Sequence, residues 1–230
     1  MQSWSLAIAT GLAVMAGPPA LAQNALVAGT GYAQLSPALA APGQLLTVFV
    51  HGVGAALTGP VQASSLPLPS TLAHISASVT QDLSPQGPLA VPILAVFPAP
   101  IACGAPSPST GCPALTGVTV QLPFELVPPG FSLAGPGSNS AVLTISDDQS
   151  NRASIQLTMQ TDAIHVVRMG DTLTGPGSPP AAGLAPSQLP PAVIHADGSN
   201  VTGTNPAKIG ETISIYVVGL GQPNGSVKTG

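Results

Sequence analysis

Apolar side chains recur at every second position in several short segments of the chain, with Gly, Pro, Ser or Asp between the segments. A period of two places alternate side chains on one face of a β-strand, so each segment offers one apolar face to a core. Short strands between such turns predict an antiparallel sandwich or barrel. Residues 89–97 differ in being almost wholly apolar, and Pro92 within them predicts a sheet edge or a bulge there. We predict strands over residues 72–79, 89–97, 117–124, 140–146, 153–160 and 163–167.

One strand-like segment occurs twice. GQLLTVFVHGVG at residues 43–54 returns as GETISIYVVGLG at residues 210–221, with four identical and six similar positions out of twelve. In each copy a Pro/Gly turn precedes a β-branched and aromatic run, and Gly-x-Gly ends the run where positive φ or a bulge is needed. We interpret each copy as the opening strand of a sandwich domain, with Phe49 and Tyr216 at equivalent positions in the core.

The N-terminus predicts export. Residues 1–22 contain an apolar core from Leu6 to Ala16, a Gly-Pro-Pro break and an Ala-Leu-Ala cleavage site that ends at Ala22. The alternative is a membrane anchor, but the segment is too short and too interrupted by proline to span ~30 Å of hydrocarbon. No later segment is apolar for long enough to cross a membrane. We therefore expect a secreted protein, either extracellular or at the periplasm or cell surface.

The remaining chain divides into three parts. We predict a β-sandwich over residues 23–169, a Pro/Gly-rich, semi-rigid linker over 170–192, and the first strands of a second, truncated sandwich over 193–230. A two-stranded piece is only marginally stable alone. The alternative is therefore that the last strands pair with the first domain or with a neighbouring molecule.

The composition excludes some classes of protein. Charged residues make up 5% of the chain, against about 25% in an average soluble domain. The 27 prolines and 26 glycines disfavour long helices. The four basic residues are too few to build a cationic face, so nucleic-acid binding through phosphate contacts is excluded.

Two cysteines, Cys103 and Cys112, lie close together in IACGAPSPSTGCPA. In an exported chain we predict a disulfide between them. Closing so short a loop would contribute about 2.5–3 kcal/mol in the chain-entropy account. Free thiols or a metal site are the alternatives, although a metal site lacks both a C-x-x-C pattern and a nearby histidine.

Three segments resemble immunoglobulin-like domains. SPALAAPGQLLTVFVHGVGAALTGP is similar to the start of IPT/TIG-type domains, and LAVPILAVFP with LTGVTVQLPFEL is similar to their middle. HADGSNVTGTNPAKIGETISIYVVGLG resembles the C-terminal module of large sets of secreted proteins in soil acidobacteria. The residues that carry this last resemblance are Asp197, Gly198, Asn205, Pro206, Ala207, Gly210, Glu211, Tyr216, Gly219, Leu220 and Gly221.

The resemblance covers about residues 30–230. It implies an all-β fold, an immunoglobulin-like antiparallel β-sandwich, together with export and no assigned activity. It supplies no catalytic residue. The insertion that carries the two cysteines departs from the family pattern.

The histidines and one acidic turn are the candidates for metal binding. A metal site needs two or three histidines to converge with a carboxylate, and the spacing of His51, His74, His165 and His195 does not predict this. In the turn SDDQSN, Asp147 and Asp148 offer oxygen ligands that suit calcium. The D-x-[DN]-x-[DN]-G pattern is missing, however, and Asp residues in turns commonly bond their own backbone. We favour a plain turn and leave calcium open.

Other chemistry finds less support. The segment GFSLA around Ser132 matches G-x-S-x-G only in part, and that motif needs a strand-to-helix turn. Asp147 and Asp148 are adjacent, so on a strand they would point to opposite faces. Asn200-Val201-Thr202 fits the glycosylation triplet, but a polar turn is the simpler reading. The aromatic residues of the mature chain, few for stacking on sugars, are Tyr32, Phe49, Phe97, Phe124, Phe131 and Tyr216.

These observations predict a non-catalytic module without cofactor or metal. We expect it to act as a spacer or as an interaction domain for a cell-surface protein or polysaccharide. A partner could be bound in two ways, through loops at one end of the sandwich or by pairing along an exposed strand edge. The alternative is an extracellular polysaccharide- or calcium-binding module. The oligomeric state is open.

Overall fold

The computed structural model of the chain describes the residue ranges 26–30, 37–54, 57–81, 87–99, 115–128, 139–168, 171, 190–225 and 227–229. The predicted signal segment, the Cys103–Cys112 disulfide and most of the predicted linker lie outside the described residues, as do Tyr32, Phe131 and Ser132. Within the described part of the chain, no helix has the length and hydrophobicity that a membrane crossing requires.

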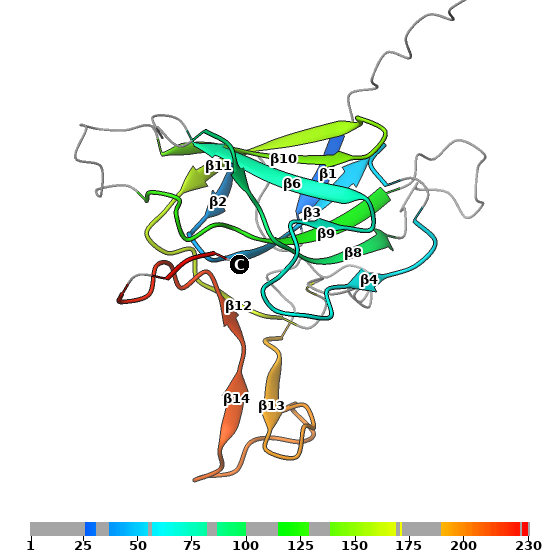
Figure 1. Cartoon of the computed structure of the whole chain (residues 1–230). Helices are drawn as coiled ribbons and strands as arrows, with labels where there is room; N and C mark the ends of the chain where they lie inside the picture. The colour runs from blue at the N-terminus through cyan, green and yellow to red at the C-terminus, as the bar shows by residue number, and fades with distance from the viewer. Residues whose placement is uncertain are drawn as a thin grey trace, which may run out of the picture.

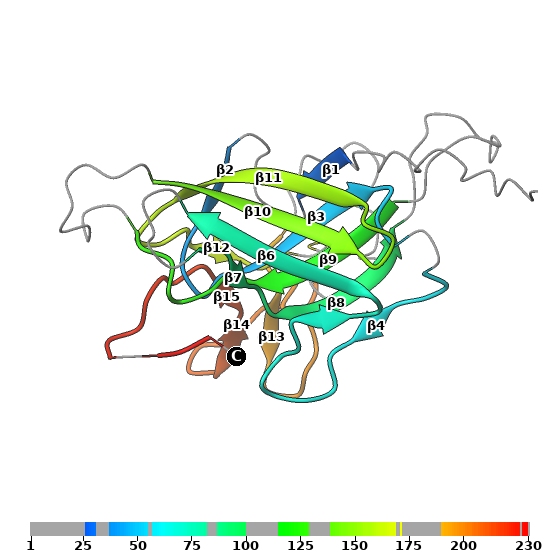
Figure 2. The same cartoon turned by 45° about the horizontal axis from the view of Figure 1, so that its top comes forward.

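Two β-sheets pack face to face as a sandwich (Figure 1, Figure 2). Sheet I has the order β1 (Leu26–Thr30), β3 (Leu45–His51), β9 (Leu115–Gln121), β8 (Ile93–Ala99) and β4 (Val61–Gln62). Sheet II has the order β2 (Ala38–Ala40), β11 (Arg152–Met159), β10 (Ser140–Asp147), β6 (Ile75–Gln81) and β5 (Thr71–Leu72), and β7 (Leu89–Ala90) also pairs with β6. The pairing is antiparallel except between β2 and β11. The predicted all-β sandwich is confirmed.

The interior between the sheets follows from the period of two. Alternate residues of the central strands are no more than 1% exposed: Leu46, Val48 and Val50 in β3, Val118 and Val120 in β9, and Ala141, Leu143 and Ile145 in β10. These side chains belong to one hydrophobic cluster that both sheets share. Burying one large apolar side chain contributes about 1.5–3 kcal/mol, so this layer holds the sheets together.

The strand predicted over 89–97 is divided between the two sheets at Pro92. Before this proline, β7 pairs with β6 in sheet II, and after it β8 pairs with β9 in sheet I. Proline has no N–H to give to a ladder, but its carbonyl oxygen accepts a hydrogen bond from Gln121 N at 2.9 Å. The register of β8 shifts between Ile93 and Ala95. The chain therefore changes sheets where the sequence predicted an edge or a bulge.

The outer face of sheet I is covered at its centre. The hydroxyls of Thr47 and Thr119 lie 2.8 Å apart, and both residues are fully buried. Phe97 is also fully buried and meets Phe49 edge-on, with ring centroids 6.2 Å apart. The Phe97 ring lies against Gly117, where an added Cβ would come within 2.4 Å of a ring carbon. Glycine is therefore required beneath this ring.

The C-terminal part of the chain forms two small sheets. The first pairs β12 (His165–Val166) with β15 (Val217–Val218), and the second pairs β13 (Val193–His195) with β14 (Ile213–Ile215). Residues 193–215 extend away from the sandwich and are called the arm (Figure 1). After β15 the chain returns to the sandwich, where Gln222 and Thr229 hydrogen-bond with residues 124–126. The last strand thus pairs with β12, which lies within the predicted first domain.

The two copies of the repeat share their backbone conformation. The equivalent glycines have similar positive φ angles: 73° and 83° for Gly43 and Gly210, 78° and 77° for Gly52 and Gly219, and 66° and 80° for Gly54 and Gly221. The turn before the strand is also shared. Ala41 N donates to Gln44 Oε1 at 2.7 Å, and Lys208 N donates to Glu211 Oε2 at 2.8 Å. The sequence repeat is therefore also a repeat of local structure.

The surroundings of the two copies differ. β3 lies between β1 and β9 and buries alternate residues completely. In the second copy, Ile213, Ile215 and Tyr216 are 39%, 52% and 55% exposed. The prediction that Tyr216 belongs to a core is wrong, because within the described residues no second sheet covers β14. Phe49, its counterpart, is half-buried against Phe97.

Candidate functional site

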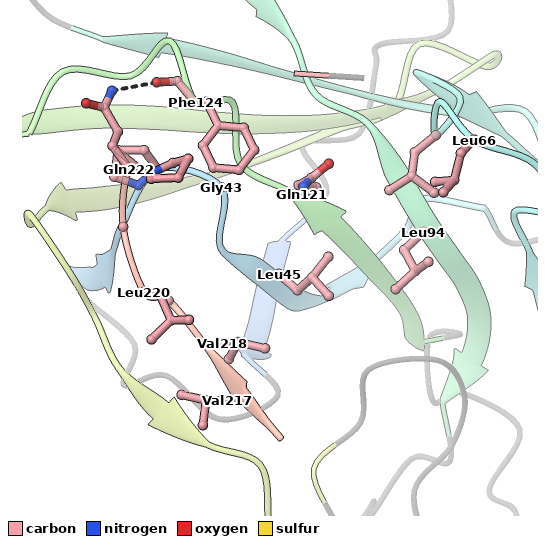
Figure 3. A pocket seen from close by; sticks show the side chains of 15 residues that line it. Gly43, Leu45, Leu66, Leu94, Gln121, Phe124, Val217, Val218, Leu220 and Gln222 are labelled. Carbon is pink, nitrogen blue, oxygen red and sulfur yellow. Dashed lines mark hydrogen bonds between the residues drawn. The ribbon is translucent and has the colours of Figure 1, made fainter. Parts of the chain in front are cut away.

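A pocket with a volume of 610 Å³ opens at one end of sheet I, beside the C-terminal segment (Figure 3). Its floor is the outer face of β3, β9 and β8, which contribute Leu45, Gln121 and Leu94. The loop between β4 and β5 forms a second side through Leu66. Residues 217–223 form the third side. The pocket therefore exists only where the C-terminal segment lies against the sandwich.

The strand alternation and one glycine set the floor and the end of the pocket. Leu46 points into the core, so its neighbour Leu45 points outward to the pocket. In the turn before β3, an added Cβ on Gly43 would lie 2.1 Å from a ring carbon of Phe124. The φ of Gly43 is 73°, a value that side chains with a Cβ rarely adopt. Glycine thus lets the Phe124 ring close one end of the pocket.

Two further glycines hold the third side in place. Gly219 and Gly221 lie so close to the backbone carbonyl oxygens of Ala163 and Thr161 that an added Cβ would come within 2.1 Å and 2.0 Å. Ala163 N donates a hydrogen bond to Gly219 O at 2.8 Å. Backbone thus meets backbone with no room for a side chain between them. This contact positions β15 and the segment that follows it.

The pocket is apolar. None of its fifteen lining residues is titratable, and of these residues Gln121 and Gln222 are the ones with polar side chains. Gln222 Nε2 donates to Phe124 O at 2.7 Å, which fastens the C-terminal segment at the pocket's end (Figure 3). A concave apolar lining with a few amide groups suits an apolar ligand. It offers no group for general acid–base or nucleophilic catalysis.

Comparison of the chain with protein-family models, with curated proteins and with solved structures finds no match. The resemblance to IPT/TIG-type domains therefore stays a prediction. The apolar lining of the pocket is therefore the basis on which we infer a function.

The structure places the four histidines in separate surroundings. His51 lies half-buried in β3, the exposed His74 Nδ1 is 3.3 Å from Asp148 Oδ2, His165 Nε2 is 2.6 Å from Asp171 Oδ2, and His195 bonds to Glu211. The described residues contain no group of three or more His, Cys, Asp or Glu side chains placed to hold a metal ion. None of these histidines lines the pocket.

The acidic turn between β10 and β11 is held together by its own hydrogen bonds. The carboxylate of Asp147 accepts from the backbone N–H groups of Gly54, Gln149 and Asn151 and from Asn151 Nδ2, at 3.0–3.1 Å. Burial raises the pKa of Asp147, but these hydrogen bonds outweigh it and hold the pKa below its usual value. Four N–H donors occupy the acceptor positions that a calcium ion would need. These contacts support the turn role, and the bond to Gly54 also ties sheet II to sheet I.

His195 and Glu211 join the two sides of the arm. The His195 side chain is 8% exposed, its Nδ1 bonds to the Glu211 carboxylate, and its Nε2 lies 3.2 Å from Asn205 O. The hydrogen bond with Glu211 is the main cause that raises the pKa of His195. The hydrogen bond from the backbone N–H of Lys208 is the main cause that lowers the pKa of Glu211, and the hydrogen bond with His195 is the second cause. The pair is therefore charged in mildly acidic solution and stabilises the arm.

We expect the arm to be most stable between about pH 4.5 and 6.5, the ordinary pKa values of the two groups. The pKa of His195 is raised on folding, so its contribution is complete below 6.5 and is lost as the pH rises through the folded value. The pKa of Glu211 is lowered, so its contribution is complete above 4.5 and is lost as the pH falls through the folded value. Hydrogen exchange of the His195 and Val201 amides, corrected for intrinsic rates, measures this.

Glu211→Gln is the matched variant for this prediction. Gln44 already makes the same turn hydrogen bond in the first copy, so the variant keeps the turn and removes the charge. We expect the pH dependence of arm protection to flatten in Glu211→Gln. An unchanged pH profile in this variant would contradict the role assigned to the pair.

The pocket was not predicted from the sequence. Its lining comes from segments far apart in the chain, and most of its residues lie outside the repeat. One signal was available, since Gly219 and Gly221 repeat Gly52 and Gly54 and mark a place of tight backbone geometry. What that backbone would lie against could not be read from the pattern.

Proposed function

We propose that the chain is a secreted, non-catalytic, immunoglobulin-like module that binds a partner protein, and that the pocket receives an extended apolar segment of this partner. The observation that carries the proposal is the apolar pocket between the outer face of sheet I and residues 217–223. A cell-surface protein fits the predicted export of the chain. The secretion signal, the Cys103–Cys112 disulfide and the IPT/TIG relationship remain parts of this proposal.

The lining supports an extended peptide as the ligand. Leu45 and Leu94 on the floor of the pocket and Val217 on its third side offer apolar contact, and Leu220 stands 68% exposed at the rim. Burying apolar surface of this kind contributes about 25 cal/mol per Å². The amide side chain of Gln121 adds an NH2 donor group, with two N–H bonds, and a carbonyl oxygen acceptor, which can pair with a peptide backbone. The pocket thus combines apolar contact with hydrogen bonding that does not depend on the ligand's side chains.

The polysaccharide and calcium alternatives receive less support from the described residues. Phe124 is the one aromatic residue in the lining, and sugar binding commonly uses several aromatic faces. The Asp147 carboxylate is occupied by N–H donors of its own turn and of Gly54. No specific contact favours either alternative over peptide binding.

A peptide selection tests the proposal. A display library of random extended peptides is selected on the immobilised protein, and the affinity of the enriched peptides is measured by calorimetry. We expect apolar sequences whose dissociation constant rises at least tenfold in Leu220→Glu, equivalent to about 1.4 kcal/mol. The reason is that an ionised carboxylate at the rim loses hydration when an apolar ligand binds.

Ile209→Glu is the matched control for this experiment. Ile209 is fully exposed in the same C-terminal part of the chain and does not line the pocket. Its replacement introduces the same charge and should leave the affinity unchanged. Peptides that bind Leu220→Glu as tightly as the unmodified protein would place the binding surface elsewhere and refute the proposal.

A further inference from the structure

One edge of β14 has no neighbouring strand among the described residues. Val193 O accepts from Val201 N, and His195 N donates to Ser199 O, so these two residues direct their backbone groups away from β14. In an antiparallel ladder the direction alternates along the strand. The backbone groups of Ile194 therefore point towards Ser214, its partner in the register. The N–H and C=O groups of Ile213 and Ile215, which flank Ser214, then point to the open edge.

The first copy of the repeat shows what belongs at this edge. Leu122 N donates to Gln44 O, so by the same alternation Leu46 and Val48 direct their backbone groups towards β9. Leu46 and Val48 correspond to Ile213 and Ile215. The open edge of β14 is therefore the equivalent of the edge of β3 that pairs with β9, and β13 takes the place of β1.

The sequence of β14 is complementary to itself in the register that β9 shows with β3. In the first copy Thr47 lies opposite Thr119, with apolar pairs Val48–Val118 and Leu46–Val120 on either side. An antiparallel pair of two β14 strands centred on Ser214 reproduces this order. Serine lies opposite serine, and Ile213 lies opposite Ile215 on each side. All four isoleucines then share one face of the new ladder.

We propose that a second copy of this chain occupies the open edge, and that two β14 strands pair antiparallel about a two-fold axis at Ser214. The surface lies on the arm, apart from the pocket, and the inference does not depend on the peptide-binding proposal. The arm extends away from the sandwich, which leaves the edge accessible (Figure 1). Pairing satisfies the outward backbone groups and covers Ile213 and Ile215, which are 39% and 52% exposed.

Charge and size set the strength of this contact. Charged residues and proline on natural edge strands prevent such strands from pairing with other chains. Residues 212–221 contain neither, so nothing in this segment opposes pairing. The contact involves three residues from each chain. The area that three residues bury is far below the roughly 1,200 Å² that stable interfaces bury. We therefore expect a reversible dimer with a dissociation constant on the order of 0.1–1 mM.

Disulfide trapping detects such a weak pair. In the proposed ladder, Ser214 and its symmetry mate form a pair without backbone hydrogen bonds, with Cα atoms about 4.5 Å apart, inside the range that a disulfide accepts. Ser214→Cys should cross-link under mild oxidation, with the 214–214 peptide identified by mass spectrometry. Gly203→Cys is the control, because Gly203 lies exposed on the same arm with open space around it. We expect it to cross-link at least tenfold more slowly.

Sedimentation gives the second measurement, from about 0.01 to 1 mM protein. The unmodified chain should show concentration-dependent dimers, Ser214→Lys should remain monomeric because two ammonium groups would face each other, and Gly203→Lys should behave like the unmodified chain. A dimer that survives Ser214→Lys would overturn the proposal. The proposal would also be overturned if the unmodified chain stayed monomeric and Ser214→Cys cross-linked no faster than Gly203→Cys. The occupant of the edge would then be a strand of another protein.

Discussion

Replacing Phe97 with alanine is expected to lower the free energy of unfolding by about 3–5 kcal/mol. Among the described residues, Phe97 is the largest fully buried side chain, and its ring lies against Gly117 and in edge-on contact with Phe49. The ring covers part of the outer face of sheet I beside Phe49, so its removal leaves a cavity there. Chemical denaturation measures the change. Val142→Ala, at a position 38% exposed on β10, is the control and should change stability by no more than about 0.5 kcal/mol.

A double-mutant cycle with Gly117 tests the reason for this loss. Alone, Gly117→Ala places a Cβ within 2.4 Å of the Phe97 ring and should cost about 1–3 kcal/mol through overpacking. In the Phe97→Ala background the ring is gone, so the added methyl group should cost little. The two substitutions would then couple by about 1–3 kcal/mol. Strictly additive costs would mean that the ring does not lie against Gly117.

The longer strands β6, β10 and β11 were predictable because each shows a period of two and buries one face. The segment predicted at 140–146 is β10 (Ser140–Asp147), and that at 153–160 is β11 (Arg152–Met159), with the turn between them as expected. Pro92 was informative because a missing N–H is a property of the residue itself and does not depend on its neighbours.

Pairing and surroundings were not predictable in the same way. A repeat in sequence specifies local geometry, and both copies do form the same turn with the same φ angles. It does not specify what packs on the strand. Phe49 and Tyr216 are therefore equivalent in the repeat, while Tyr216 is 55% exposed and Phe49 packs on Phe97. The split of 89–97 between two sheets likewise depends on partners distant in the chain.

The candidate site lies beyond the reach of periodicity for a related reason. A leucine that lines a pocket and a leucine that lines the core look alike in the sequence, as Leu45 and Leu46 illustrate. Of the residues that the sequence singled out for chemistry, His195 serves a hydrogen bond of the arm and Asp147 serves hydrogen bonds of a hairpin turn. The pocket is created by the contact of the C-terminal segment with residues 161–163, and that contact depends on two glycines.

Gly219→Ala is therefore expected to release the C-terminal segment from the sandwich. The φ of 77° alone would strain alanine by about 1–2 kcal/mol. In addition, the new Cβ would lie 2.1 Å from the carbonyl oxygen of Ala163, a backbone atom that cannot turn aside. We expect β15 to separate from β12, and the amides of Ala163 and Val167, which donate to Gly219 O and Tyr216 O, to exchange at least tenfold faster.

Gly210→Ala separates the two causes, because Gly210 is a glycine of the same repeat with a φ of 83° and no atom within 4 Å of the added Cβ. It carries the conformational strain without the steric conflict, so the Ala163 and Val167 amides should remain protected. Selected peptides should lose affinity for Gly219→Ala, because residues 217–223 form one side of the pocket, and should still bind Gly210→Ala. If both variants bind peptide equally and only the exchange rates differ, the docked segment is structural and the ligand contacts another surface.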